Sequence, residues 1–340
     1  MKLVKTEDAV GHILCHDMTQ IIKDEYKDAR FRKGHVVTEE DIPVLLSMGK
    51  EHLYVYEVTP DMVHENDAAE RLLALCGTEN MTRSEVKEGK IELRAACDGI
   101  FLVDSHRLYR VNSQDEVMIA TRKGGTAVKK GDKLAGMRVI PLIIEEGKLK
   151  KAEDAAGTEP LVSLRPFVRK TACIISTGNE VKKGLIKDTF TPVVQEKLLH
   201  YGVETLDIDY SGDGVENVRD MILDKKEKFH PDMILCTGGM SVDPDDTTPG
   251  GIRAAGADVV CYGAPVLPGA MFLLAYFEDG TPIMGLPGCV MYAKATVFDL
   301  VLPKVVADVK VSRSDISALG EGGLCLGCGE CHYPICPFGK

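Results

Sequence analysis

Three short loops combine glycine with hydroxyl or proline residues directly after apolar segments. They are Ser176-Thr177-Gly178-Asn179-Glu180, Thr237-Gly238-Gly239-Met240-Ser241 and Leu286-Pro287-Gly288. Glycine lets the main chain approach a ligand closely, and main-chain N–H groups can hold a phosphate. Each loop alone could be an ordinary turn between a strand and a helix. Three such loops at equivalent places favour a binding site for an anionic small molecule.

An acidic run follows the second loop. Asp243, Asp245 and Asp246 place three carboxylates within four residues. Hard cations such as Mg²⁺ prefer carboxylates together with phosphate oxygens, so these three aspartates are the candidate catalytic residues. The alternative is a helix start enriched in acidic residues, which explains one capping aspartate better than it explains three.

The C-terminal tail contains four of the 11 cysteines, at Cys325, Cys328, Cys331 and Cys336. Their spacing, with Pro337 after the last one, resembles ferredoxin-type cluster motifs with one additional residue. We therefore expect these thiolates to hold a [4Fe–4S] cluster. Zinc is the alternative, because His332 could replace one thiolate. A reactive thiol tail is the third possibility.

The elements that position the three loops alternate between strand and helix. Apolar runs predict strands at 171–176, 203–208, 233–236, 272–277 and 282–286. Helical periodicity predicts helices over 191–201, over 215–229, from 248 onwards and over 289–306. This alternation predicts a mainly parallel sheet with right-handed crossovers, and ligands bind such sheets at the carboxyl ends of the strands.

At this point the motifs resemble a known family. The run Thr237-Gly238-Gly239 followed by Asp246-x-Thr248-Pro249 resembles the T-G-G…D-x-T-P motif of molybdopterin adenylyltransferases. The same stretch resembles the G-G-x-S…D motif of molybdenum insertases, and residues 176–180 resemble the insertase S-T-G-D-E loop. Leu267-Pro268-Gly269 and Leu286-Pro287-Gly288 resemble its P-G and L-P-G loops. All five elements stand in the family order.

The resemblance implies a three-layer α/β/α molybdopterin-binding domain. It also implies a transferase reaction in which the adenylylated pterin takes up molybdate with loss of AMP, assisted by a divalent cation such as Mg²⁺. A non-catalytic molybdopterin carrier or sensor with a redox-active cysteine tail is the alternative. The residues expected to contact the pterin are Ser176, Thr177, Gly178, Glu180, Thr237, Gly238, Gly239, Ser241, Thr248, Pro268, Gly269, Pro287 and Gly288.

Three positions depart from the insertase pattern. Asp243 stands where the pattern has glycine, and Cys289 stands where it has asparagine. The P-G loop, 266–271, carries no lysine. Fewer cations near a dianionic ligand should weaken its binding unless other groups compensate.

The rest of the chain predicts three further parts. Residues 1–60 form a small α+β unit with a helix between Thr38 and Gly49 and a strand at 52–58. Residues 61–165 form a β-rich module that precedes the 166–312 domain, and 313–340 form the tail. Within the module we expect a helix capped by Asp67, short strands at 99–103, 108–111, 116–120 and 138–144, and a linker at 151–160.

Composition narrows the class of protein. With 340 residues, 44% of them hydrophobic and 27% charged, the chain is typical of a soluble globular protein. A net charge of −11 without a basic stripe argues against nucleic acid. The absence of a long apolar segment argues against a membrane span, and the acidic start is unlike a signal peptide, so we expect a cytoplasmic location. Expected partners are the pterin, molybdate, further copies of the chain in a homo-oligomer, and molybdoenzyme apoproteins.

Overall fold

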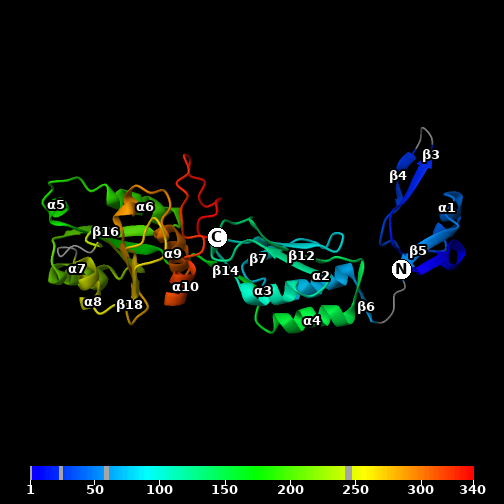
Figure 1. Ribbon diagram of the computed structural model, residues 1–340, viewed down its shortest axis with the longest axis horizontal. Coiled ribbons are helices and arrows are strands. Elements are labelled where there is room, and N and C mark those ends of the chain that lie inside the picture. Colours follow the sequence, from blue (N-terminus) through cyan, green and yellow to red (C-terminus); the bar gives the residue numbers. More distant parts are fainter. Residues whose placement is uncertain (1, 23–25, 57–60, 242–246) are drawn as a thin grey trace. The chain divides into compact units, whose positions relative to one another are not determined.

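The computed structural model describes residues 2–22, 26–56, 61–241 and 247–340 (Figure 1). The chain divides into two compact units. The first comprises Met1–Ala96, Val103–Gly124 and Gly131–Ser163, and the second comprises Cys97–Leu102, Gly125–Lys130 and Leu164–Lys340. Within the described ranges, no helix has both the length and the apolar character needed to cross a membrane.

Antiparallel sheets dominate the N-terminal half of the chain, in agreement with the β-rich module predicted for residues 61–165. The strands pair in the orders β1-β5-β2, β3-β4, β10-β12-β8-β7, β13-β6 and β11-β9-β14. Their bounds are β1 Lys2–Lys5, β2 Ile13–Leu14, β3 Met18–Ile22, β4 Tyr26–Phe31, β5 His52–Tyr56, β6 Met62–His64, β7 Met81–Arg83, β8 Ile91–Ala95, β9 Gly99–Val103, β10 Val117–Thr121, β11 Thr126–Val128, β12 Lys133–Val139, β13 Ile143–Glu145 and β14 Val162–Pro166.

Helices of this half depart from the sequence prediction in three places. Helix α1, Asp41–Ser47, forms where expected, but α2, Glu65–Ala74, is capped by His64 and not by Asp67. Residues 108–111 belong to α3, Ser105–Asn112, which starts because the side chain of Asp104 accepts the N–H of Arg107. The expected linker lies largely in α4, Glu146–Ala156, which is stable because its apolar face is buried. The apolar residues in these short segments fit the spacing of a strand and that of a helix, so tertiary packing decides which of the two forms.

The second unit contains a six-stranded sheet in the order β16-β15-β17-β20-β19-β18. Strands β16, β15, β17 and β20 are mutually parallel, and β19 is antiparallel to both β20 and β18. Five of the six strands therefore point the same way, which agrees with the mainly parallel sheet predicted from the strand–helix alternation. The strand at 258–262 was not predicted, and the strand predicted at 272–277 is the antiparallel one. Their bounds are β15 Thr171–Thr177, β16 Glu204–Ser211, β17 Met233–Thr237, β18 Asp258–Tyr262, β19 Leu273–Tyr276 and β20 Pro282–Leu286.

Apolar side chains cover both faces of this sheet, which gives the three layers predicted. On one face, Ile174 and Leu235 pack with side chains of α6, Phe190–His200, α9, Val297–Val306, and α10, Arg313–Ala318. On the other face, Ile175 and Cys236 pack with α7, Val215–Phe229, and α8, Thr248–Ala254. Neighbouring residues of one strand face opposite sides, so each strand contributes to both cores. The short helix α5 covers Asn179–Lys182.

The long helix predicted over 289–306 is wrong. Only a single 3-10 turn, η2 Gly288–Met291, follows β20, and α9 begins several residues later. The cause is a capping box, in which the hydroxyl of Thr296 accepts from the start of α9 and Asp299 accepts the N–H of Thr296 at 2.7 Å. A capping residue has non-helical backbone angles, so the helix cannot extend through it.

A buried ion pair fixes α7 to β16. Lys225 is 4% exposed, and its Nζ lies 2.8 Å from Oδ2 of Asp207 and 2.7 Å from Oδ2 of Asp209. The bond from Lys225 lowers the pKa of Asp209. The buried lysine therefore stays charged, because the two carboxylates of β16 offset the cost of removing its ammonium group from water. This contact positions the end of β16 and the loop that follows it.

Candidate functional site

The three loops predicted from the sequence meet on one edge of the second unit's sheet. In the ladder, Ser176 is opposite Thr237, and Thr237 is opposite Leu286. These residues close three neighbouring parallel strands, so the loops after them leave the sheet side by side. We call the row of strand ends the carboxyl edge. The expected convergence of the three loops is present.

Two threonines connect the first loop to the second at this edge. The hydroxyls of Thr177 and Thr248 lie 2.9 Å apart. Thr177 also reaches the carbonyl oxygen of Thr237 at 3.0 Å, and Thr248 reaches that of Gly238 at 2.9 Å. Both residues are buried, at 8% and 0% exposed. Each hydroxyl has one proton, so the two hydroxyls donate two of these three bonds at a time. The contacts tie β15, β17 and α8 into one unit, and we call these two residues the threonine pair.

Glycine is required beside the threonine pair. A Cβ atom on Gly238 would lie 2.3 Å from the carbonyl oxygen of Thr177, and one on Gly239 would lie 2.7 Å from the hydroxyl of Thr248. Both residues have positive φ, 81° and 57°. No other residue combines this backbone conformation with so close an approach. The two glycines are therefore needed to build the edge, whichever ligand it binds.

A fourth loop, 211–214 after β16, joins the edge and was missed by the sequence analysis. The amide of Asn179 donates to Asp213, and the N–H of Gly214 donates to the hydroxyl of Thr247 at 2.9 Å. Lys182 of α5 extends over this loop, with Nζ 3.6 Å from the Cβ position of Gly212. The run Ser211-Gly212-Asp213-Gly214 is itself a turn signal that could have identified it. Lys182 supplies a cation at this edge.

Hydroxyls on the opposite face of the sheet lack partners. Thr237 lies two residues after Leu235, so its side chain faces the α6 side. Its Oγ1 is buried and has no hydrogen-bond partner among the described residues. The same holds for Oγ1 of Thr191 in the first turn of α6. Buried hydroxyls are normally satisfied, so these two atoms are candidates for a contact with water or with a ligand.

The remaining predicted residues occupy varied positions. Ser176 and Pro287 are buried, Gly178 is half-buried, and Glu180, Ser241 and Gly288 are exposed. Gly285, just before the third loop, is packed so closely that a Cβ would lie 2.5 Å from the sulfur of Met240. Asp243, Asp245 and Asp246 lie outside the described residues.

The predicted P-G loop has a structural role in addition to any ligand contact. It is the tip of the connection between β18 and β19. Gly269 packs against the start of α9, where a Cβ would lie 2.5 Å from Cγ1 of Val297. Leu267 donates its N–H to Gly323 and accepts the N–H of Cys325, both at 2.8 Å. The loop is thus held by the helix on one side and by the tail on the other.

The cysteines show two different environments. Burial raises the pKa of Cys289 in η2, so this thiol is not activated. In the tail, Cys325 and Cys336 are half-buried, while Cys328 and Cys331 are exposed. Over the part of the chain that the structure describes, no three His, Cys, Asp or Glu side chains are grouped closely enough to hold a metal.

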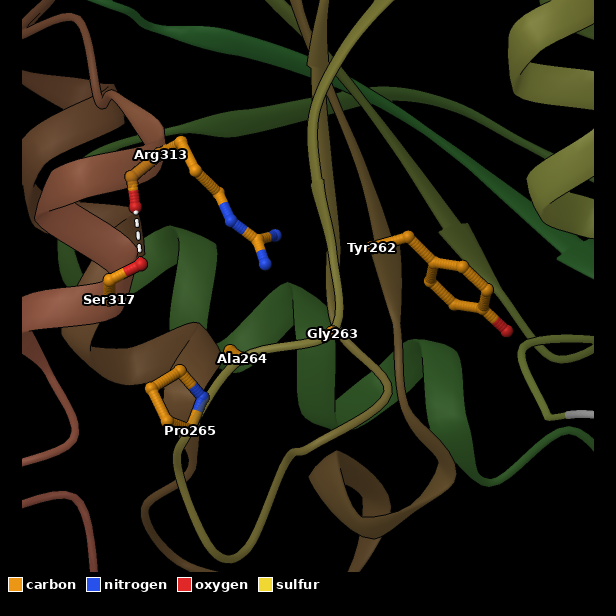
Figure 2. A pocket seen from close by; sticks show the side chains of 6 residues that line it. All are labelled: Tyr262, Gly263, Ala264, Pro265, Arg313 and Ser317. Atoms are coloured by element: carbon orange, nitrogen blue, oxygen red, sulfur yellow. Dashed lines mark hydrogen bonds between the residues drawn. The ribbon is translucent and has the colours of Figure 1, made fainter.

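An open pocket of about 440 Å³ lies at the β18 end of the same edge. Figure 2 shows Arg313 of α10 directing its guanidinium toward the strand that carries Tyr262 and Gly263. On the loop side, the hydroxyl of Tyr262 donates to the carbonyl oxygen of Met240 at 2.9 Å. Arg313 lies far along the sequence from the other edge residues, so no motif could have indicated it.

A parallel sheet whose strand ends gather glycine, hydroxyl and cationic residues is typical of α/β domains that bind a small anionic molecule. Residues 173–307 match the family described as a probable molybdopterin binding domain, so this region is a domain of that family. The family predicted from the motifs is confirmed for this region. Residues 3–57 match a domain of unknown function, DUF8806.

The chain is also similar to individual proteins over different shares of its length. The chain is 21% identical over 308 residues to a molybdopterin molybdenumtransferase of Staphylococcus epidermidis, covering 84% of this chain and 66% of the relative. It is 34% identical over 79 residues to a CinA-like protein of Thermosipho melanesiensis, covering 23% of this chain and 19% of the relative. A solved molybdopterin biosynthesis MoeA protein of Pyrococcus horikosii is 16% identical, with coverage of 94% and 77% and a TM-score of 0.34.

The packing at Gly238 leads to a stability prediction. We expect Gly238→Ala to lower the thermal midpoint by at least ~2–4 °C more than Gly256→Ala does. Gly256 is a matched control, because its φ of 88° carries the same backbone penalty while an added Cβ would meet nothing within 4 Å. The extra loss measures the clash with Thr177. Equal midpoints for the two variants, determined by circular dichroism, would show that the close approach is not needed.

Proposed function

We propose that this chain binds molybdopterin, or its adenylylated form, at the carboxyl edge, and that it transfers molybdate to the pterin with loss of AMP in a Mg²⁺-dependent reaction. The observation that carries the proposal is the threonine pair with Gly238 and Gly239, which fixes the strand-end loops of a molybdopterin-binding domain at one place. The protein would then be a molybdopterin molybdenumtransferase.

The chemistry of the edge fits a phosphorylated ligand. Main-chain N–H groups next to glycine can donate hydrogen bonds to a phosphate without steric hindrance. The unpartnered hydroxyls of Thr191 and Thr237 are additional donors near the same loops. Lys182 supplies a cation at the β16 end of this edge, because its ammonium lies beside the loop at 211–214.

In this proposal, three aspartates hold the Mg²⁺ ion. Asp243, Asp245 and Asp246 follow Ser241, so they are connected to the loop at the carboxyl edge by a few residues. A Mg²⁺ ion held by these carboxylates and by the pyrophosphate of the adenylylated pterin would stabilise the charge that develops on the departing AMP. Water would cleave the pyrophosphate, so that AMP leaves and the pterin retains its phosphate. The two dithiol sulfurs would bind molybdate, and their two protons would leave with one molybdate oxygen as water.

A second candidate function is a molybdopterin carrier or sensor. It is favoured by Cys289 and by the P-G loop, which departs from the insertase pattern and is packed against the tail. In that case the pterin would bind at the same edge without turnover, and the cysteine tail would report redox or metal status. Both candidates involve the pterin, further copies of this chain in a homo-oligomer, and molybdoenzyme apoproteins as recipients.

The contribution of Lys182 to ligand binding can be tested by substitution. We expect Lys182→Gln to weaken binding of molybdopterin about fivefold, which corresponds to roughly 1 kcal/mol for one exposed cation near a phosphate. Its neighbour Lys183 is also exposed and is the matched control, so Lys183→Gln should leave the dissociation constant unchanged. Titration calorimetry under anaerobic conditions gives both values. Equal effects of the two substitutions would remove Lys182 from the site.

The second prediction separates catalysis from binding. We expect Asp246→Asn to retain pterin binding but to abolish Mg²⁺-dependent release of AMP, because the amide keeps the shape of the side chain and loses its charge. The assay follows AMP release from adenylylated pterin with molybdate by chromatography. Normal turnover in this variant would make Asp246 a helix cap only. A wild-type protein that binds pterin but releases no AMP would favour the carrier.

A further inference from the structure

The C-terminal segment 322–340 is a closed loop that is fixed at both ends to the second unit. At its start, Gly323 and Cys325 bond to the main chain of Leu267, each at 2.8 Å. Near its end, the hydroxyl of Tyr333 donates to the carbonyl oxygen of Asp299 at 3.0 Å, and Phe338 is buried in the core on the α9 side. The two ends meet where the N–H of Gly339 donates to Gly322 at 2.9 Å.

Glycine makes this closure possible. A Cβ on Gly322 would lie 2.5 Å from the carbonyl oxygen of Lys340, and a Cβ on Gly339 would lie 2.4 Å from Cδ2 of Leu300. A Cβ on Gly323 would lie 2.4 Å from the carbonyl oxygen of Leu319. Both ends of the segment are therefore packed against the second unit, and residues 326–332 between them are exposed.

The four thiols divide between the packed and the exposed parts of the segment. Cys325 and Cys336 are half-buried and pack against the core of the sheet, whereas Cys328 and Cys331 are exposed. Exposed apolar side chains flank them: Leu324 is 62% exposed, Leu326 70% and Ile335 85%. Thiols and apolar side chains left exposed together are unusual, and an apolar shell is what a metal–thiolate centre requires.

We propose that this segment is a metal clasp in which Cys325, Cys328, Cys331 and Cys336 bind one [4Fe–4S] cluster beside the Leu267–Gly269 loop. Four thiolates are the complete ligand set for such a cluster. Among the described residues no three thiols are grouped closely enough to hold a metal, so cluster binding requires Cys328 and Cys331 to move toward Cys325 and Cys336. Gly327 and Gly329 allow the intervening chain to turn. Two residues separate Cys328 from Cys325 and from Cys331, so neighbouring ligands are three residue steps apart and span at most about 10 Å, enough to bring Cys328 and Cys331 inward.

The clasp would act on the P-G loop through the main chain. Because Leu267 is hydrogen-bonded to both Gly323 and Cys325, a ligand that fixes Cys325 also fixes the loop. Cluster binding should therefore slow exchange of the Leu267 amide. This inference is independent of molybdate transfer, since it concerns the tail and its own readouts.

The test uses the full chain purified anaerobically and reconstituted with ferrous iron and sulfide. We expect about four irons and four sulfides per chain, with broad visible absorbance that bleaches in air. Cys328→Ser should lose at least nine-tenths of the iron. Because Cys328 is exposed, this variant should fold. Cys97→Ser, which alters a half-buried thiol outside the segment, should keep the full iron content.

Two measurements decide the result. A colourless protein with one zinc per chain, or iron content unaffected by Cys328→Ser, would overturn the cluster. Hydrogen exchange of the Leu267 amide, compared between reconstituted and apo protein, tests the coupling. Slower exchange on cluster binding supports the clasp, and unchanged exchange in a protein that holds four irons would overturn its action on the loop.

Discussion

The close approach between Thr177 and Gly238 is the constraint on which the site depends. The carbonyl oxygen of Thr177 occupies the space where any other residue at 238 would place its Cβ atom. That approach lets Thr177 and Thr248 share a hydrogen bond, and this bond ties α8 to the ends of β15 and β17. A loop with a side chain at position 238 could not keep these three elements together. The arrangement of the carboxyl edge therefore depends on glycine at this position.

The sheet supplies the rigidity that this contact needs. Side chains from alternate positions of each strand enter two separate cores, so a strand cannot shift without disturbing both. The ion pairs of Lys225 with Asp207 and Asp209 connect α7 to β16. They thereby help to determine where the 211–214 loop leaves the sheet. The edge consequently divides into an α8 side, which carries the threonine pair, and an α6 side, which carries the unpartnered hydroxyls of Thr191 and Thr237.

Sequence patterns predicted this part of the fold well because its signals are local. The central strands β15, β17 and β20 are mostly apolar runs, each loop begins where the run ends, and the order of elements determines which ends share an edge. The predictions were wrong where packing decides, as in α3 and α4 and in the break before α9 at Thr296. The bond from Asn179 to Asp213 and the docking of Leu267 on Gly323 join distant residues, and no local pattern encodes such pairs.

A crystal structure of the protein with bound molybdopterin would test this site directly. We expect the phosphate of the ligand within hydrogen-bonding distance of the loops at Thr177–Gly178 and Gly238–Gly239, with the pterin extending along the carboxyl edge. A ligand bound in the first unit, or bound in the pocket at Arg313 without contact to these loops, would contradict this expectation.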